Sequence, residues 1–542
     1  MSRKPWFLPT LLVLIWLVMI GITNPIGNFP INDDWQYARP VSSLVNQGKY
    51  ISPDAYSPII IAQVFYGAIF CKLFGFSFTV LRISVLVLGI IGVLVFYSLV
   101  KRFSSTKLAF IGALILLVNP LYFSLANSFM TDVPFLVFTL ISMYFFIIST
   151  ENDRPVYYVI IATVFACIAT LVRQFGVIIP IAFGLTMILK ALPQIQIGKV
   201  KYLIPAIIAI VVYATGLWWL THIGSELKPY EGQQVGNFLS DILGLSNRMF
   251  GRIGLIIYYA AVFLLPLLVV LNISELKQFS RRQKTITGII LVICCIPLIH
   301  MWNTLPCGNY VNGMFIGPKT IKHLTGYNEY EVSRLARIII SIVSFICAVI
   351  LILNIVIAFK DSKAEATDDS KPELFYQRIF IVLCLCGYSF LVFVFQAFFD
   401  RYLLLPIPLL FLLLVSKPGI AINLKGRGII ATYSIIFLTG LMTVLQTHDY
   451  MEWNRSKWRA LDYLTKECNI SSHKIDGGYE FNGWYNIRSY DGKVGRSCVY
   501  VDDDEYIVTH NTGFEGYKII KQFQYQNYFP FEEKTMYIFH KE

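Results

Sequence analysis

The sequence predicts an α-helical protein that crosses a membrane many times and carries a small α/β domain at its C-terminal end. Three observations predict this fold. The chain of 542 residues is 56% hydrophobic and only 14% charged, whereas a soluble globular protein carries about 25% charged residues. Apolar runs recur that approach the roughly 17–25 residues needed to cross about 30 Å of hydrocarbon. Residues 447–542, by contrast, alternate short apolar stretches with polar turns.

Thirteen apolar runs are candidate membrane spans. We place them near 6–23, 80–100, 108–123, 133–149, 156–172, 175–190, 202–220, 253–272, 286–302, 337–359, 377–397, 403–416 and 429–446. Residues 57–74 are also apolar, but counting them as a span would put the basic segment 101–107 outside. Because Lys and Arg are enriched in cytoplasmic loops, we expect residues 57–74 to form a helix that lies in the outer interface.

The distribution of charge sets the orientation. Short basic connections such as 101–107 and 275–284 belong inside with the N-terminus, and an odd number of spans then puts residues 447–542 outside. Those residues contain 12 Lys and Arg against 15 Asp and Glu, whereas the rest of the chain contains 33 against 18. A basic excess limited to the membrane part fits cytoplasmic loops and phospholipid headgroups, and it disfavours nucleic acid as a partner.

The chain divides into a transmembrane domain (1–446) and an outer α/β domain (447–542). Within the outer domain we expect a helix at 453–467 and strands at 473–480, 497–510, 517–526 and 535–541. Cys468 and Cys498 are the only cysteines of this domain. In an oxidising compartment they are a candidate disulfide, and the alternative is two separate thiols.

Carboxylates occur at two places where the chain is expected to meet the outer surface of the membrane. Asp33 and Asp34 follow the first apolar run, and Asp132 comes just before another. A carboxylate at this boundary can act as a general base toward a hydroxyl that attacks a lipid-borne electrophile. The alternative is an ordinary helix cap, because acids favour helix N-termini. Asp33 and Asp132 would have to share one outer cavity for the functional interpretation to hold.

Two arginines, Arg173 and Arg401, interrupt apolar runs on the outer side. This is contrary to the usual enrichment of Lys and Arg on the cytoplasmic side. A guanidinium suits a phosphate group, which it binds through paired hydrogen bonds. The alternatives are an arginine that extends its charge to the interface, or a local pair between Asp400 and Arg401.

Three short motifs resemble those of the GT-C glycosyltransferases, above all the protein O-mannosyltransferases and the lipid A aminoarabinose transferases. "DDWQYA" (33–38) resembles the signature of their first outer loop, D-[DE]-x-x-Y-A. "ANSFMTDVPFLVF" (126–138) resembles their second-loop motif, and "DRYLLLPIPLL" (400–410) resembles their late Arg-Tyr motif with following prolines. The Trp-Trp-Asp pattern of oligosaccharyltransferases is absent from residues 447–542, which disfavours transfer of a whole oligosaccharide.

The resemblance implies roles for individual residues. Asp33 matches the catalytic base, Asp34 the adjacent acid, and Tyr37 the tyrosine behind them. Asp132 matches the second-loop acid that shapes the site, and Arg401 matches the late arginine near the donor phosphate.

One departure concerns the donor phosphate. The aminoarabinose transferases carry a Lys-Pro-Pro-like stretch after the first loop, and the equivalent segment here, 52–61, has no lysine. Lys49 or Arg173 would have to supply that positive charge. We assign Tyr402 and Asn309 to the substrate pocket, the latter from an outer stretch rich in Asn, Gly and aromatic residues.

These observations predict an inverting glycosyltransferase that moves a single sugar from a polyprenyl phosphate to an acceptor of the cell envelope: a glycolipid such as lipopolysaccharide, a glycan or a protein. We expect a monomer in the bacterial inner membrane, with its site facing the periplasm. We expect that no cofactor is required, and we assign no metal ligand. A divalent cation could still bridge Asp33 and Asp132, but the sequence does not require one. The alternatives are a secondary transporter or flippase for lipid-linked sugars, which would carry ionisable groups near the bilayer midplane, and a non-enzymatic envelope assembly or receptor protein.

Overall fold

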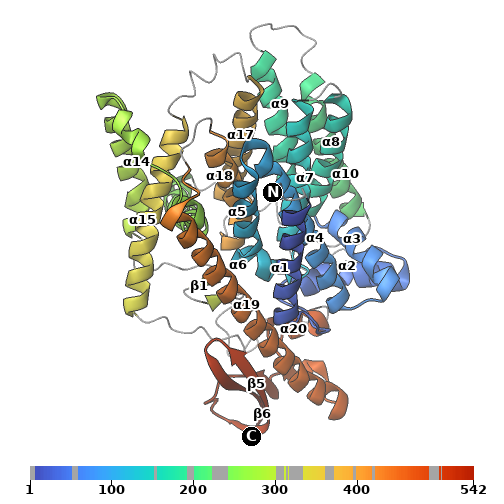
Figure 1. Cartoon of the computed structure of the whole chain (residues 1–542). Coiled ribbons are helices and arrows are strands. Elements are labelled where there is room, and N and C mark those ends of the chain that lie inside the picture. The colour runs from blue at the N-terminus through green and yellow to red at the C-terminus, as the bar shows by residue number, and fades with distance from the viewer. Residues whose placement is uncertain are drawn as a thin grey trace.

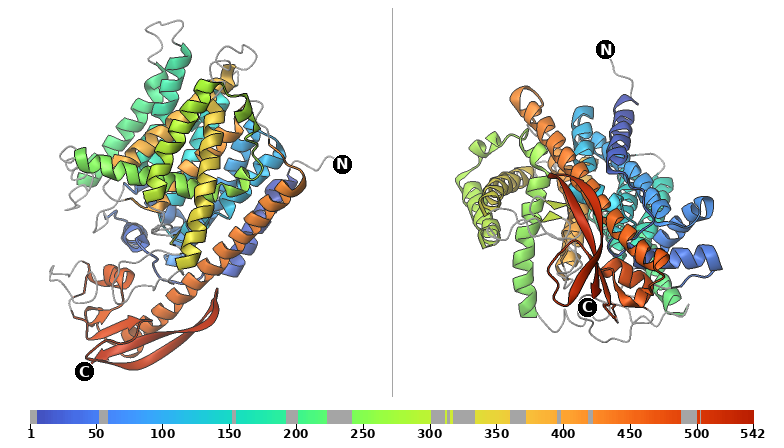
Figure 2. Two further views of the ribbon diagram at one scale, coloured as in Figure 1. Left: turned by 90° about the vertical axis from the view of Figure 1, so that its left-hand side faces the viewer. Right: turned by 90° about the horizontal axis from the view of Figure 1, so that it is seen from below.

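The computed structural model describes residues 6–51, 59–151, 155–191, 201–222, 242–300, 311–312, 315–316, 334–359, 372–394, 398–417, 422–487, 500–501 and 503–542. Within these residues, long apolar helices form a bundle, and a small sheet domain lies at one end of the bundle (Figure 1). We call this end of the bundle the domain end. Figure 2 shows the same arrangement from the side and from below. The predicted fold class, a helical membrane protein with a C-terminal α/β domain, is confirmed.

Eight helices of the described residues are long and apolar enough to cross a membrane, and a bent pair adds a ninth. The eight correspond to α4 (Phe78–Phe103), α7 (Asp132–Ser149), α8 (Pro155–Val172), α9 (Ile178–Ala191), α10 (Ile204–His222), α15 (Arg334–Phe359), α17 (Pro372–Val394) and α19 (Gly426–Asp462). Further helices are α1 (Phe7–Thr23), α12 (Ile242–Phe263), α13 (Leu265–Leu268), α14 (Arg281–His300) and α18 (Pro406–Val415). Each predicted apolar run overlaps one of these helices or the bent pair, while the number of thirteen spans stays a prediction.

The predicted span at 108–123 is bent. It consists of α5 (Thr106–Leu117) and α6 (Pro120–Ala126), which meet at 60°. Pro120 has no N–H to continue the helical hydrogen bonds, and Asn119 caps the new helix by accepting hydrogen bonds from the backbone N–H groups that follow, at 2.9 and 3.2 Å. All residues from 108 to 140 are buried, so the bend carries the second loop into the interior.

The first loop contains two helices, α2 (Asp34–Gln47) and α3 (Ile61–Phe74). The helix expected at 57–74 is therefore present from Ile61 onward, and its place at the interface stays a prediction. Arg82 of α4 is fully buried and donates hydrogen bonds to the carbonyls of Pro25, Gly27 and Phe29 at 2.5, 3.2 and 3.0 Å. These bonds fix the non-helical segment that leads into α2.

The outer domain is a four-stranded sheet in the order β3-β4-β6-β5. Its strands are β3 (Ile475–Asp476), β4 (Tyr506–Thr509), β5 (Tyr517–Tyr528) and β6 (Phe531–Lys541). β3 and β4 are parallel and the other pairs are antiparallel. All four expected strands are present, but the first and second are shorter than predicted. The segment 473–480 turns at Gly478, whose φ of +81° suits glycine, and continues as helix α20 (Tyr479–Asn486).

α19 runs without a break across the predicted domain limit at 446/447. The helix expected at 453–467 is its continuation, because the segment 441–462 contains neither Gly nor Pro to end a helix. Phe29 and Ile31 of the first loop belong to the same hydrophobic cluster as Trp453 and Ile538 of the outer domain. The limits 1–446 and 447–542 stay a prediction, and the two parts share one continuous helix and one hydrophobic cluster.

Candidate active site

Asp33 is the residue that precedes α2, but its carboxylate does not cap that helix. Oδ1 accepts a hydrogen bond from the Tyr479 hydroxyl at 2.9 Å. Oδ2 lies 3.4 and 3.5 Å from the two terminal nitrogens of the Arg401 guanidinium. The side chain of Asp33 is 23% exposed and that of Arg401 is 8% exposed. The helix-cap alternative for Asp33 is therefore wrong for its side chain, which points into an ion pair.

Asp34 is placed differently although it is the next residue. It is 1% exposed. Its Oδ1 accepts from the Ile31 N–H at 2.5 Å, and its Oδ2 accepts from the Phe129 N–H at 3.3 Å. Burial raises the pKa of the Asp34 carboxyl to about 8, against the opposing effects of Arg82 and of the two N–H groups. Asp34 thus joins the first loop to the second loop underneath Asp33.

Asp132 and Arg173 form a second, drier ion pair. Their nearest atoms, Oδ1 and Nη1, are 3.0 Å apart, and the side chains are 1% and 7% exposed. The Arg173 Nε donates to the Thr131 hydroxyl at 2.6 Å. Because Asp132 opens α7 and Arg173 follows the end of α8, this pair ties two helix ends together.

A close turn sets the direction of Arg173. The chain leaves α8 in an extended conformation at Arg173 and enters the short helix η1 (Gln174–Val177). A Cβ at Gly176 would lie 2.4 Å from the backbone nitrogen of Thr170. Only glycine fits this approach, so the sequence "RQFG" positions the guanidinium as well as supplying it.

Arg401 is held by its own short helix η5 (Asp400–Leu404). Asp400 accepts hydrogen bonds from the backbone N–H groups of Arg401 at 3.0 Å and Val311 at 2.7 Å. The guanidinium of Arg401 meanwhile points to Asp33 and lies 4.7 Å from the ring centre of Phe399. The alternative of a local pair between Asp400 and Arg401 therefore holds for the backbone N–H of Arg401. It does not hold for the guanidinium, which faces Asp33.

The two ion pairs meet around two tyrosines. Burial raises the pKa of the Tyr37 hydroxyl, and the charges that act on it are Asp33, Arg401, Arg173 and Asp132. The ring centre of Tyr402 lies 5.6 Å from the Arg173 guanidinium and 6.0 Å from that of Arg401. The structure thus brings together six of the predicted site residues, from loops that are far apart in the sequence.

Tyr479 is the site residue that sequence reasoning missed. It comes from α20 of the outer domain, and besides donating to Asp33 it accepts a hydrogen bond from Gln36 at 2.9 Å. α20 lies tightly against α2, because Gly483 leaves no room for a Cβ, which would be 2.5 Å from Trp35. Arg39 donates to the carbonyls of Gly483 and Trp484. The segment was predicted to be a strand, and no charge marks this tyrosine in the sequence.

The other predicted residues are not joined to this cluster. Lys49 is exposed just beyond α2, and its carbonyl accepts from the Ser43 hydroxyl at 2.8 Å. Asn309 and Cys498 lie outside the described residues, so the pocket role of Asn309 and the disulfide with Cys468 stay predictions. Within the described residues, no group of three or more His, Cys, Asp and Glu side chains could hold a metal ion, and the divalent cation also stays a prediction.

A comparison with family models matches residues 61–219 to dolichyl-phosphate-mannose-protein mannosyltransferase. This stretch contains the second-loop motif with Asp132, and it contains Arg173. The resemblance to the GT-C glycosyltransferases, and to the protein O-mannosyltransferases among them, is confirmed over this part of the chain. Asp33 and Arg401 lie outside it. No match was found among curated proteins.

Solved structures show a fainter likeness. ArnT from Cupriavidus metallidurans bound to undecaprenyl phosphate is 13% identical over 81% of this chain and 78% of that one, with a TM-score of 0.35. The archaeal oligosaccharyltransferase AglB from Archaeoglobus fulgidus, in complex with an inhibitory peptide and a dolichol-phosphate, is 14% identical with a TM-score of 0.43. The match covers 86% of this chain but 58% of AglB. Both TM-scores are below 0.5, so these structures assign no residue of the site.

Proposed function

We propose that this protein is a membrane glycosyltransferase that moves one sugar, with inversion, from a polyprenyl phosphate to a hydroxyl of a cell-envelope acceptor. The observation that carries the proposal is the convergence of the Asp33–Arg401 and Asp132–Arg173 pairs at the domain end of an apolar bundle. A carboxylate beside two guanidinium groups offers a base for a hydroxyl and a cradle for a phosphate in one place.

In the proposed reaction, Asp33 takes the proton of the acceptor hydroxyl while the acceptor oxygen attacks C1 of the sugar. The bond between C1 and the phosphate oxygen breaks, and the lipid phosphate leaves with the electron pair. Arg401 and Arg173 bind that phosphate. Because a phosphate is a good leaving group, no strong general acid is needed. Tyr479 holds the other oxygen of Asp33, which keeps the base oriented.

Arg401 would change partners during this cycle. Without a donor it faces the Asp33 carboxylate at 3.4 Å. When a phosphate takes its place, Asp33 is released to accept a proton. This exchange explains why a base and a phosphate-binding cation can stand in contact in the resting protein.

An apolar cavity supports a lipid-linked donor. It has a volume of about 730 Å³ and is lined by one face of α8 from Pro155 to Leu171, together with residues of α9 and α10. These positions on α8 cover roughly 24 Å at 1.5 Å per residue. Leu171 is two residues before Arg173, so a hydrocarbon chain in this cavity would leave its phosphate near the site.

The position of the charges favours this proposal over a transporter or flippase. Asp132 is the first residue of α7, Arg173 follows α8, and Arg401 precedes α18. A transporter is expected to carry its ionisable groups near the bilayer midplane. The match of residues 61–219 to a mannosyltransferase family adds support for glycosyl transfer. We further propose a monomer in the bacterial inner membrane with this site on the periplasmic side.

The test uses membranes that carry the protein and a panel of labelled polyprenyl-phosphate monosaccharides. We expect transfer of one sugar to an envelope fraction, and a loss of about 10²–10⁴-fold for Asp33→Asn because the general base is removed. Asp462→Asn changes an acid at the end of α19 whose side chain is 48% exposed; it is the matched control and should keep full activity. Equal activity of Asp33→Asn and wild type would contradict the role of Asp33. Export of the intact lipid-linked sugar without transfer would favour the flippase.

A further inference from the structure

The turn that joins β5 to β6 is unusually apolar for an exposed turn. Its residues are Tyr528, Phe529, Pro530 and Phe531, and we call them the aromatic turn. Tyr528 is 42% exposed, Phe529 37% and Phe531 80%. Phe531 is the most exposed large hydrophobic side chain among the described residues. Exposed aromatic residues gathered in this way mark a surface that meets another partner.

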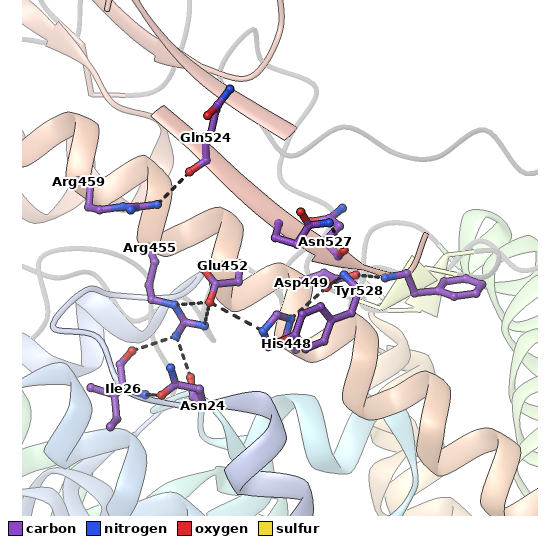
Figure 3. Close-up of polar contacts among 12 residues, drawn as sticks. Asn24, Ile26, His448, Asp449, Glu452, Arg455, Arg459, Gln524, Asn527 and Tyr528 are labelled. Carbon is purple, nitrogen blue, oxygen red and sulfur yellow. Dashed lines mark hydrogen bonds and ion pairs between the residues drawn. The ribbon is translucent and has the colours of Figure 1, made fainter. Parts of the chain in front are cut away.

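The aromatic turn is fixed to α19 (Figure 3). The Asp449 carboxylate accepts hydrogen bonds from the backbone N–H groups of Tyr528 and Phe529 at 2.7 and 2.8 Å. The His448 ring stacks on the Tyr528 ring, with centres 3.7 Å apart and planes 8° from parallel. The turn therefore has a defined position along α19, at residues 448 and 449.

That position is the end of the apolar part of α19. Residues 428–447 contain no charged side chain, and 20 residues of helix extend about 30 Å, which is the thickness of the hydrocarbon layer. Ile430, Phe437 and Leu438 on this stretch are 66%, 68% and 57% exposed, as expected for a surface that faces lipid. His448 and Asp449 are the first strongly polar residues beyond it.

A second apolar helix ends beside the polar part of α19. α1 packs along α19 and ends at Thr23. Arg455 of α19 donates hydrogen bonds to the carbonyls of Asn24 and Ile26 at 2.8 and 3.1 Å, and it also pairs with Glu452 at 2.7 Å (Figure 3). The polar groups that follow both apolar helices are thus bonded together, so the apolar parts of α1 and α19 end on the same side of the bilayer.

We propose that the aromatic turn is a membrane anchor, which places its side chains in the headgroup region of the lipid leaflet at the domain end. Tyr is enriched in this region because its ring is amphipathic, and exposed Phe side chains enter the boundary between headgroups and acyl chains. The Glu532–Lys534 ion pair, 2.6 Å long, follows at the start of β6 and stays on the water side. The anchor holds the sheet against the bilayer. This proposal does not depend on which reaction the candidate active site performs.

The chain offers a matched control for this proposal. Ile520 lies on β5 and is 44% exposed, comparable to Tyr528. It is eight residues from the turn, or about 27 Å along an extended strand. The headgroup region is only roughly 5–8 Å thick on each side, so Ile520 should lie in water.

The experiment places the photoreactive residue p-benzoylphenylalanine at 531 or at 520 in the full chain. Each variant is reconstituted into vesicles of phosphatidylethanolamine and phosphatidylglycerol and irradiated, and the lipid bound covalently to the protein is measured by mass spectrometry. We expect lipid capture at 531 to exceed that at 520 by at least about tenfold, because only the turn reaches the headgroup region.

Equal lipid capture at the two positions would overturn the proposal. So would capture of the protein's own segments, or of no lipid, at 531. Both substitutions are at exposed side chains, so the fold should be preserved, and a third probe at Phe529 repeats the measurement within the same turn.

Discussion

The two acid–arginine pairs of the candidate site differ in how tightly they are closed. Asp132 and Arg173 are 3.0 Å apart and almost completely buried. Asp33 and Arg401 are 3.4 Å apart, and Asp33 is 23% exposed. The first pair joins the ends of successive helices, whereas the second joins residues 368 positions apart.

This difference indicates which of the two pairs can open during the reaction. Opening the dry Asp132–Arg173 pair would leave a charge buried without its partner, which is costly. Opening the Asp33–Arg401 pair costs less on the side of the acid, because Asp33 is 23% exposed to water and keeps the hydrogen bond from the Tyr479 hydroxyl, while a substrate phosphate can take its place beside Arg401. The looser pair is therefore the one that can exchange partners, and the tighter one holds the frame around it.

The largest effect on stability is expected for Arg173→Ala. It leaves the buried Asp132 carboxylate unpaired, so the free energy of unfolding should fall by about 3–5 kcal/mol. Arg401→Ala leaves an acid that is partly exposed and keeps its hydrogen bond from Tyr479, so the loss should be smaller, about 1–3 kcal/mol. Denaturant unfolding in detergent micelles compares the two variants, and equal losses would remove the distinction between the pairs.

A smaller effect is expected for Tyr479→Phe, which removes the hydroxyl that orients Asp33. A hydrogen bond to a charged group contributes about 1.5–3 kcal/mol, so kcat should fall by about tenfold or more. The ring still packs against Trp35, with centres 5.8 Å apart, so the loss of stability should not exceed the same amount, about 1.5–3 kcal/mol. Tyr485→Phe on the same helix α20, where the side chain is 49% exposed, is the control. Unchanged kcat in Tyr479→Phe would mean that the outer domain only covers the site.

The most gradual effect concerns Asp34, which joins the two loops beneath the pairs. Its pKa is raised from 3.8 to about 8 by burial, so the folded protein binds a proton that the unfolded chain has released. Stability should therefore decrease as the pH rises from about 4 to about 8, by at most about 1.4 kcal/mol per pH unit. Unfolding midpoints across this range test it. In Asp34→Asn this decrease should disappear, and an unchanged slope would assign the pH dependence to another group.

The sequence predicted the charged part of the site because charge is conspicuous in this chain. Asp33, Asp132, Arg173 and Arg401 each interrupt or border an apolar run, and a helix end at the membrane surface explains their position. Their pairing was not predicted, since it depends on how α2, α7, α8 and η5 pack. The role of Asp34 was implied by the resemblance and stays a prediction; the start of a helix turns consecutive side chains in different directions, and the Asp34 carboxylate accepts from the N–H groups of Ile31 and Phe129.

Tyr479 could not be predicted for a related reason. The chain has 32 tyrosines, and only the close packing of Gly483 on Trp35 brings this one to Asp33. The start of α20 was predicted to be part of a strand because Ile475 precedes the two glycines at 477 and 478 and Tyr479 follows them. α19 was predicted in two pieces because its apolar half and its polar half carry different patterns, although nothing in its sequence interrupts the helix.

The most direct test compares polyprenyl-phosphate binding with sugar transfer in Asp33→Asn and Arg401→Ala. If Asp33 is the base and also holds Arg401 in the resting state, Asp33→Asn should bind the lipid phosphate at least as tightly as wild type while transferring sugar at least about 100-fold more slowly. Arg401→Ala should lose binding. A parallel loss of binding and transfer in Asp33→Asn would contradict the exchange of partners, and Asp33 would then be part of the binding site only.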